Sequence, residues 1–468
     1  MPTYQMDSVL TSGGWLRDVA VTVSEQGLIA GLAVGAEAAG ATHITGTVVP
    51  GMPNAHSHAF QRAMAGDSEF RTGARDSFWT WRDAMYALAN SVEPEDLELI
   101  ATQLFVEMLK AGYTSVAEFH YLHRHSDGSA YPGPNALWQA IDAAAHTAGI
   151  ALTLLPTLYL SSDFGARPLR REQQRFRLSV DEFLRAIAQR RSARSARSAR
   201  SAHDGGSVHT GAALHSLRAV PLDSLREAVA GLRDIDPAGV IHIHIAEQLR
   251  EVQACQGATG RRPIELLLDT GLVDPHWCLV HATHATAAEI AAVAASHASV
   301  CVCPSTEGNL GDGFFDAARL FTAGGRLCIG SDSQATVCPA EELRWLEYQQ
   351  RLRRRRRAVL ATNPEPHVGA RLWRESARCG ALALGQNIGT IEVGRRADWL
   401  VLDAAHPALA GASEDAVLDR LVFGGGQAAL RDVVVAGRWV VKDRHHRDED
   451  EVARRFASWM RRRSPRAY

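Results

Sequence analysis

The chain of 468 residues is longer than one ordinary domain and fits one large barrel with a smaller unit. Its formal net charge of -2 creates no overall field that would recruit nucleic acid or an anionic membrane surface. No apolar run is long enough to span a bilayer, and the first ten residues do not read as a signal peptide. The seven cysteines lie in apolar, strand-like runs without a Cys-x-x-Cys pair, which indicates reduced core residues of a cytoplasmic protein.

Short strands are predicted at both ends of the chain. Residues 1–48 contain β-rich runs separated by Gly-rich turns, and similar runs recur over 390–403 and 430–441. Two all-β segments that flank a long middle region predict one small β domain built from both termini. We therefore assign 1–48 and 386–468 to a β-sandwich domain with a C-terminal helix, and 49–385 to the domain between them.

The middle region alternates short apolar runs with helical patterns such as 94–111, 135–148 and 221–232, which predicts βα units and a parallel sheet. Eight such runs end near His56, Tyr121, Leu160, His215, Ala246, His281, Pro304 and Asp332. Eight strands with alternating helices predict an α/β fold, a (β/α)8 TIM-like barrel. In that fold the chemistry lies at the C-terminal ends of the strands, where five of the eight runs here end in a polar or ionisable residue.

Two basic segments interrupt this pattern. Residues 191–202 contain three Ser-Ala-Arg repeats, which read either as a basic arm for nucleic acid or a partner or as a solvated loop. We favour the loop. The charged pattern over 341–357 favours a solvated helix face over a binding patch.

The first barrel run ends in a His-x-His pair, His56 and His58. Side chains at i and i+2 of an extended segment point to the same face, so both imidazoles can bind one metal ion from one side. The spacing alone is a weak signal, because a chain with 20 histidines contains some such pairs by chance.

Further candidate ligands lie at the ends of later runs. His242 and His244 alternate with apolar residues and share a face of the fifth strand, and spacing alone does not choose firmly between them. We take His242 as a hydrogen-bonded core residue and His244 as the ligand. With Asp332 after the eighth run, the set offers three imidazoles and a carboxylate. Such N/O ligands suit one divalent metal ion, Zn2+ first and less selectively Fe2+ or Mn2+.

The order of these motifs resembles the amidohydrolase superfamily: His-x-His after strand one, His-x-x-Glu after strand five, His after strand six and Asp after strand eight. Gly394-x-x-Ala397-Asp398 is similar to part of that superfamily's split β domain. No lysine stands between residues 111 and 441, which excludes the two-metal arrangement bridged by a carboxylated lysine. The chain is similar instead to the mononuclear deaminase branch, which implies proton-transfer roles for Glu247, His281 and Asp332.

Finer motifs resemble one family of that branch, the formimidoylglutamate deiminases. They are 53–62 (PNAHSHAFQR), 78–82 (FWTWR), 118–123 (EFHYLH), 215–220 (HSLRAV) and 303–313 (CPSTEGNLGDG). The resemblance implies metal-dependent hydrolysis of N-formimino-L-glutamate to N-formyl-L-glutamate and ammonia, in histidine degradation. Arg82, in an aromatic-rich loop, and Arg218 are the candidates for binding the two substrate carboxylates, because arginine binds carboxylates bidentately. The resemblance adds Gln61, Tyr121 and His215 as neutral donors.

Other interpretations stay open from the sequence alone. Arg82 could cap a helix or pair with Asp83, and Tyr121 could be a core residue. The enzyme could be a deaminase of another substrate, such as guanine or a related aromatic base, or the barrel could be a non-catalytic scaffold. We expect no nucleic-acid or membrane partner, and only the family resemblance suggests a homodimer.

Overall fold

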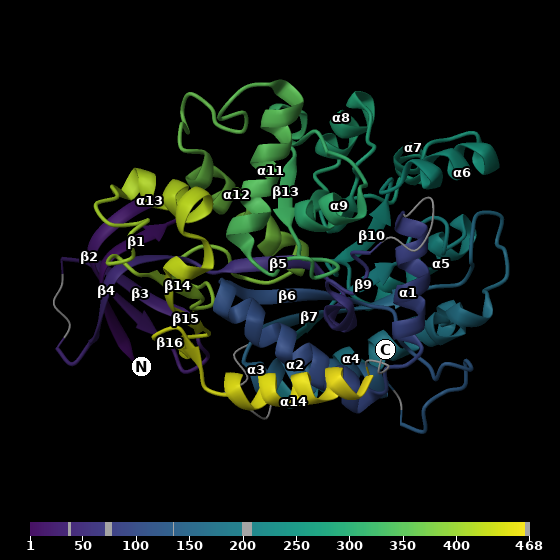
Figure 1. The fold of residues 1–468 in the computed structure, drawn as a ribbon, viewed down its shortest axis with the longest axis horizontal. Coiled ribbons are helices and arrows are strands. Elements are labelled where there is room, and N and C mark those ends of the chain that lie inside the picture. Colours follow the sequence, from purple (N-terminus) through teal and green to yellow (C-terminus); the bar gives the residue numbers. More distant parts are fainter. Residues whose placement is uncertain (36–38, 71–76, 134, 199–207, 464–468) are drawn as a thin grey trace.

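The computed structural model describes residues 1–35, 39–70, 77–133, 135–198 and 208–463. Their strands form two sheets, one from the middle of the chain and one from both termini (Figure 1). This arrangement confirms the predicted fold class. No helix of the described part of the chain has the length and apolar character needed to cross a membrane.

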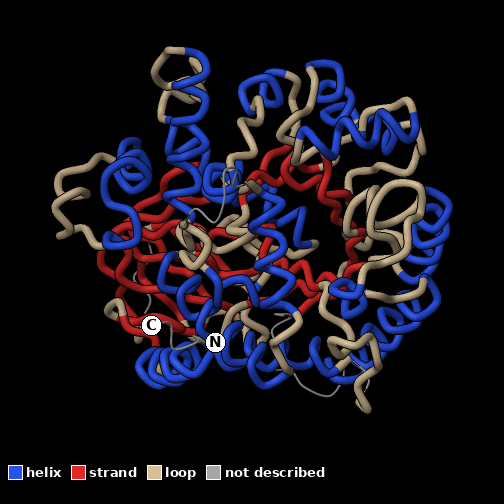
Figure 2. The backbone as a smooth tube through the Cα atoms, turned by 45° about the vertical axis from the view of Figure 1, so that its right-hand side comes forward, coloured by secondary structure: helices blue, strands red, loops and turns tan. Residues whose placement is uncertain are grey.

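The middle sheet is a nearly closed parallel barrel whose strands follow one another in chain order. Its strands are β5 (Met52–Ser57), β6 (Tyr113–His120), β7 (Ala151–Leu158), β9 (Ala212–Leu214), β10 (Ile241–Ile245), β11 (Trp277–His281), β12 (Ser299–Val302) and β13 (Arg326–Ile329). A short extra strand, β8 (Val208–Thr210), pairs with β7. The first and last strands meet through a bridge between Ser57 and Asp332, which brings the two ends of the candidate site together. Figure 2 shows the strands as a ring with helices outside it.

Helices cover the outside of the barrel because their apolar faces need a partner. In α2 (Pro94–Ala111) a proline opens the helix, acidic residues occupy the first turn, Lys110 lies in the last turn, and Gly112 ends it in the left-handed conformation. The other helices between the two terminal segments are α1 (Phe78–Ala89), α3 (Ala136–Ala148), α4 (Val180–Ser198), α5 (Leu222–Ile235), α6 (Leu249–Thr259), α7 (Pro263–Leu268), α8 (Ala287–Ala295), α9 (Pro304–Leu310), α10 (Ala317–Thr322), α11 (Pro339–Arg354) and α12 (Val368–Leu384). Every residue of β5, β6, β7, β10 and β11 is buried, as expected for a parallel sheet covered by helices.

The terminal sheet joins strands from the two ends of the chain. Its order is β17 (His445–His446), β16 (Arg438–Lys442), β15 (Leu430–Val435), β14 (Trp399–Leu402), β4 (Thr42–Pro50), β1 (Thr3–Thr11), β2 (Gly14–Val23) and β3 (Ile29–Val34). Strand β4 runs parallel to β1 and antiparallel to β14, so it is the seam between the two termini. The sheet has its own core, in which the ring of Tyr4 packs edge-on against Trp399 at 5.3 Å. The exact domain boundaries stay a prediction.

The predicted C-terminal helix is α14 (Glu449–Arg463), which lies along α2 (Figure 1). Lys110 Nζ lies 2.5 Å from Glu449 Oε2, and Trp459 Nε1 donates a hydrogen bond to Asp96 Oδ1 at 2.6 Å. These contacts fasten the end of the chain to the barrel.

The Ser-Ala-Arg segment differs from our expectation. We predicted a solvated loop over 191–202, but α4 continues to Ser198, and 199–202 lie outside the described residues. Alanine and arginine have high helix propensities, so the repeat extends the helix rather than ending it. Arg191 pairs with Asp236 at 2.6 Å, which ties this part of the helix to the body of the protein.

The cysteines agree with the predicted reduced core. All seven are buried free thiols: Cys255, Cys278, Cys301, Cys303, Cys328, Cys338 and Cys379.

Candidate active site

The C-terminal ends of the barrel strands carry an unusual backbone feature. Ala246, His281, Asp332 and Gln334 have positive φ angles of 50°, 69°, 45° and 66°, respectively. Residues other than glycine seldom adopt this conformation, and where they do they often lie at functional sites. The turns after β10, β11 and β13 therefore aim side chains into the mouth of the barrel at some cost in backbone energy.

Four predicted ligands converge at this mouth. His56 Nε2 lies 3.3 Å from Asp332 Oδ1, and His58 Nε2 lies 3.4 Å from the same oxygen. His244 Nε2 lies 3.0 Å from His56 Nε2. One donor atom from each of the four buried residues lies within 4.8 Å of all the others. Strand β5 and the turn after it supply the first two, and β10 and the turn after β13 supply the others.

The hydrogen bonds around the cluster prepare it for a cation. His58 Nδ1 donates to the carbonyl of Phe119 at 2.8 Å, and His244 Nδ1 donates to the carbonyl of His215 at 3.0 Å. A carbonyl can only accept, so the ring proton lies on Nδ1 and the Nε2 lone pair points into the cluster. The lone pair of His244 thus faces another imidazole nitrogen beside a carboxylate. A bound divalent metal ion would neutralise this arrangement, so the residues fit such an ion.

The protonation states of the candidate ligands also favour the binding of a metal ion. Burial lowers the pKa of His56 to about 3, so its ring is neutral at physiological pH. Burial acts to raise the pKa of Asp332, but the adjacent imidazoles, His56 first, hold that pKa below its usual range. Neutral imidazoles and an ionised carboxylate are the forms that bind metal.

His242 has the structural role that we predicted for it. The side chain is fully buried, and its Nε2 donates to the carbonyl of Ala383 at 2.8 Å. This bond holds the ring at the floor of the barrel, below the ligand cluster. His242 is therefore a hydrogen-bonded core residue.

Glu247 and His281 lie beside the cluster. His281 Nε2 is 3.8 Å from Glu247 Oε1 and 3.8 Å from Asp332 Oδ2. Burial raises the pKa of Glu247 to about 7, with the charges of Asp332 and Glu251 adding to the effect. Glu251 holds the turn that carries Glu247, since its carboxylate accepts hydrogen bonds from the amides of Ala246 and Glu247 at 3.2 and 3.0 Å.

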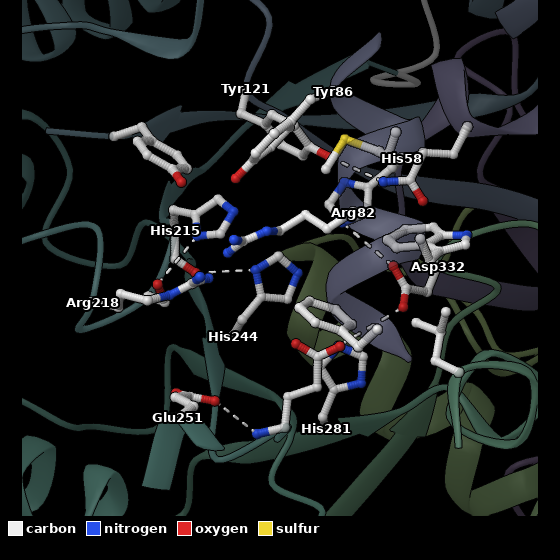
Figure 3. Close-up of a pocket in the computed structure, with 18 of the residues that line it drawn as sticks. His58, Arg82, Tyr86, Tyr121, His215, Arg218, His244, Glu251, His281 and Asp332 are labelled. Atoms are coloured by element: carbon white, nitrogen blue, oxygen red, sulfur yellow. Dashed lines mark hydrogen bonds and ion pairs between the residues drawn. The ribbon is translucent and has the colours of Figure 1, made fainter. Parts of the chain in front are cut away.

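A cavity opens over these residues. Arg82 and Arg218 extend into it from opposite sides (Figure 3). Among the described residues, neither guanidinium has a carboxylate within ion-pair distance, and Arg82 Nε and Arg218 Nη1 are buried without a hydrogen-bond partner. Buried polar groups seldom lack partners, so these nitrogens point to an anionic ligand.

Arg82 lies in a helix rather than in the loop that we predicted. Helix α1 begins after Ser77, whose side chain accepts the amide of Trp79 while Thr80 returns a hydrogen bond to Ser77. This capping box starts the helix four residues before Arg82. The guanidinium carbon lies 4.4 Å from the ring centroid of Trp79. Arg82 is therefore placed by stacking, and it pairs with no described carboxylate, Asp83 included.

The other predicted substrate residues line the same cavity. Gln61 Nε2 donates to the hydroxyl of Tyr121 at 2.9 Å, and His215 Nδ1 lies 3.2 Å from Ser216 Oγ. The structure thus brings Gln61, Tyr121 and His215 together with both arginines, although their roles stay predictions.

Several lining residues escaped the sequence analysis. Tyr86 and Tyr159 line the cavity, and Gln173 Nε2 donates to their hydroxyls at 3.1 and 2.9 Å. Tyr86 lies one turn after Arg82, and that helical spacing was the available signal. Tyr159 and Glu251 gave none, because a tyrosine in an apolar run and a glutamate in a helix usually have structural roles.

Comparison with known proteins places the chain among hydrolases. The model of the amidohydrolase family matches residues 47–440. The formimidoylglutamate deiminase of Pseudomonas aeruginosa is 48% identical over 450 residues, which cover 96% of this chain and 97% of that protein. The crystal structure of an amidohydrolase from Brucella melitensis matches with a TM-score of 0.91 and 38% identity, over 99% of both chains.

An adenosine deaminase from Xanthomonas campestris, solved with bound zinc, matches with a TM-score of 0.78 and 22% identity over 98% of each chain, a likeness of the fold alone. The match to the Pseudomonas enzyme confirms the resemblance predicted from the motifs. The chain therefore belongs to the amidohydrolase family and is a hydrolase.

Proposed function

We propose that this enzyme hydrolyses N-formimino-L-glutamate to N-formyl-L-glutamate and ammonia, a step of histidine degradation. The observation that carries the proposal is a pair of cavity arginines, Arg82 and Arg218, that form no ion pair with a described carboxylate and face a four-ligand cluster across one cavity. A small diacid with a reactive C=N group matches both features. The relative from Pseudomonas aeruginosa, a formimidoylglutamate deiminase, supports the same substrate.

We assign His56, His58, His244 and Asp332 as ligands of one divalent metal ion, Zn2+ by preference. Three imidazole nitrogens and a carboxylate oxygen are common zinc donors, and the adenosine deaminase of similar fold contains zinc. When bound, the ion would supply Lewis acidity that lowers the pKa of water towards ~7.

The chain's own groups then move protons. Asp332 accepts a proton from the attacking water as the water oxygen adds to the formimino carbon. His281, whose Nε2 lies 3.8 Å from Asp332 Oδ2, assists that transfer. Glu247, as the carboxylate, holds the amidinium form of the substrate. It then takes the second proton of the added water and delivers it to the departing nitrogen. The C–N bond to that nitrogen breaks, ammonia leaves, and the carbon keeps the water oxygen as a formyl group.

The far end of the cavity binds the glutamate part. Arg82 and Arg218 bind its two carboxylates through paired N–H donors. Gln61, Tyr121 and His215 contribute neutral polar groups around the same end. Two fixed cations suit a diacid better than the flat neutral ring of guanine.

The test of the function is ammonia release from N-formimino-L-glutamate, with guanine as the comparison substrate. We expect turnover of the diacid only, loss of turnover after dialysis against a chelator, and recovery with one equivalent of Zn2+. Turnover of guanine but not of the diacid would overturn the substrate assignment. Full activity in metal-free protein would overturn the metal assignment.

The role of Glu247 has a separate test. Glu247→Gln should lower kcat by about 10²–10⁴-fold, because the amide cannot transfer a proton. Zinc content should stay at one ion per chain, since Glu247 is not in the ligand set. Near-normal turnover of this variant would contradict its assignment as the proton donor.

We also propose a cytoplasmic location and a homodimer. The seven free cysteines favour a reducing compartment. The homodimer rests on family resemblance, and light scattering of the purified protein measures it directly.

A further inference from the structure

One buried carboxylate next to the site has no role in the proposed chemistry. Glu307 lies on α9, the short helix that follows β12 in the 303–313 motif, and its side chain is inaccessible to solvent. Its Oε1 accepts a hydrogen bond from the amide of Cys303 at 3.0 Å. The same oxygen lies 3.4 Å from His281 Nδ1.

The imidazole of His281 therefore lies between carboxylates on both of its sides. Its Nδ1 faces Glu307 on the helix side, and its Nε2 faces Glu247 and Asp332 on the cavity side, each at 3.8 Å. The ring is 1% exposed, so bulk solvent has little access to it. A carboxylate only accepts hydrogen bonds, so the proton on Nδ1 stays with Glu307 and exchange takes place at Nε2.

We propose that Glu307 is a positioning residue that acts through His281. It holds the ring with Nδ1–H turned away from the cavity, so that Nε2 stays directed at Glu247 and Asp332. Carboxylates that orient a histidine in this way are used by many hydrolytic sites. The inference rests on the proposed function, because it needs His281 to take part in proton transfer.

A purely structural role would be to hold the start of α9 through the Cys303 amide. The oxygen that performs that task, Glu307 Oε1, also faces His281 Nδ1 at 3.4 Å, so the carboxylate contacts the catalytic ring as well as the start of the helix. The chain also holds α9 by a second buried carboxylate, Glu342 of α11, which accepts the amide of Ser305 at 3.0 Å and the hydroxyl of the same residue. Among the described residues, Glu342 is not one of the hydrogen-bond or ion-pair partners of His281. It is therefore the matched control.

The experiment compares Glu307→Gln with Glu342→Gln in the zinc-loaded enzyme acting on N-formimino-L-glutamate. Each substitution replaces a buried carboxylate with an amide of the same shape. In both cases the carboxylate is one that holds α9 in place. We expect Glu307→Gln to lower kcat by about 10–100-fold at unchanged KM and zinc content. Glu342→Gln should leave kcat within about twofold. Equal losses in both variants, or normal kcat in Glu307→Gln, would overturn the positioning role.

A second readout needs neither a variant of Glu307 nor turnover. In zinc-loaded wild-type enzyme with ¹⁵N-labelled histidine, the signal of His281 is assigned by its absence in His281→Asn. The proposal requires a proton on Nδ1, whatever the state of Nε2, and a ring protonated at Nε2 alone would overturn it. If the wild type fails to turn over the diacid, the proposed function fails, and the NMR result still decides the Glu307–His281 contact.

Discussion

The mouth and the floor of the barrel each hold a histidine from the same strand. His242 and His244 lie two residues apart in β10, on one face and both buried. At the floor, His242 gives its Nε2–H to the carbonyl of Ala383. At the mouth, His244 gives its Nδ1–H to the carbonyl of His215, which leaves Nε2 to the ligand cluster. The backbone partner of each ring, rather than the residue type, decides which histidine is a core residue and which one presents Nε2 to the ligand cluster.

The two ends also differ in the kind of buried polar group that lacks a partner. At the floor, Thr153 Oγ1 donates to the carbonyl of Leu384, and Gln386 Nε2 donates to Thr153 Oγ1, both at 2.8 Å. At the mouth, His56 Nδ1 and nitrogens of both cavity arginines lack partners among the described residues. At the floor, His242 Nδ1 also lacks a partner, so the mouth differs in that its unpaired nitrogens include those of two charged guanidinium groups, which are typical of a binding site.

The largest effect is expected from His244→Gln. The variant loses one imidazole ligand at the mouth, so zinc content should fall well below one ion per chain. The loss of Lewis acidity, worth several kcal/mol, should lower kcat/KM by at least about 10³-fold. Elemental analysis and the ammonia assay measure both. Retention of one tightly bound zinc with normal activity would remove His244 from the ligand set.

A smaller effect is expected at the far end of the cavity, from Arg218→Met. The variant should raise KM for the diacid by roughly 10–100-fold, because a charge-assisted hydrogen bond is worth about 1.5–3 kcal/mol. Zinc content should not change. Arg62→Met is the control, since Arg62 pairs with Glu107 at 2.6 Å outside the cavity lining. An unchanged KM in Arg218→Met would exclude that arginine from substrate binding.

The smallest effect on activity is expected at the floor. His242→Leu leaves the buried carbonyl of Ala383 without its donor, so the free energy of unfolding should fall by about 1–3 kcal/mol. Denaturant titration of zinc-free protein measures this loss. Zinc content and kcat of the folded variant should match wild type. If His242→Leu lost zinc as His244→Gln does, the contrast between floor and mouth would be wrong.

Much of the fold could be predicted because local patterns agree with it. The eight barrel strands end near the residues that we named, and the helix predicted over 94–111 matches the bounds of α2. Turn signals and apolar periodicity are local properties, so they survive without tertiary information. The ligand set followed from the strand ends, because parallel strands in a barrel bring those ends to one rim.

The remaining features depend on contacts between distant segments. The alternation of side chains along a strand places His242 and His244 on one face. Their roles differ only because they lie at different levels along the barrel axis. The Ser77–Thr80 capping box was a local signal for the helix that carries Arg82, and we missed it. Glu307 gave no local signal, because its meeting with His281 joins two segments 26 residues apart.

The seam in the terminal sheet can be completed only late in the synthesis of the protein. Strand β4 leads through Gly51 into β5, which carries His56, and its outer edge is covered by β14. During synthesis at the ribosome, that edge stays open until residues 399–402 emerge, after the whole barrel has been translated. Open strand edges attract other chains, so unfinished molecules of this enzyme should be its most aggregation-prone form.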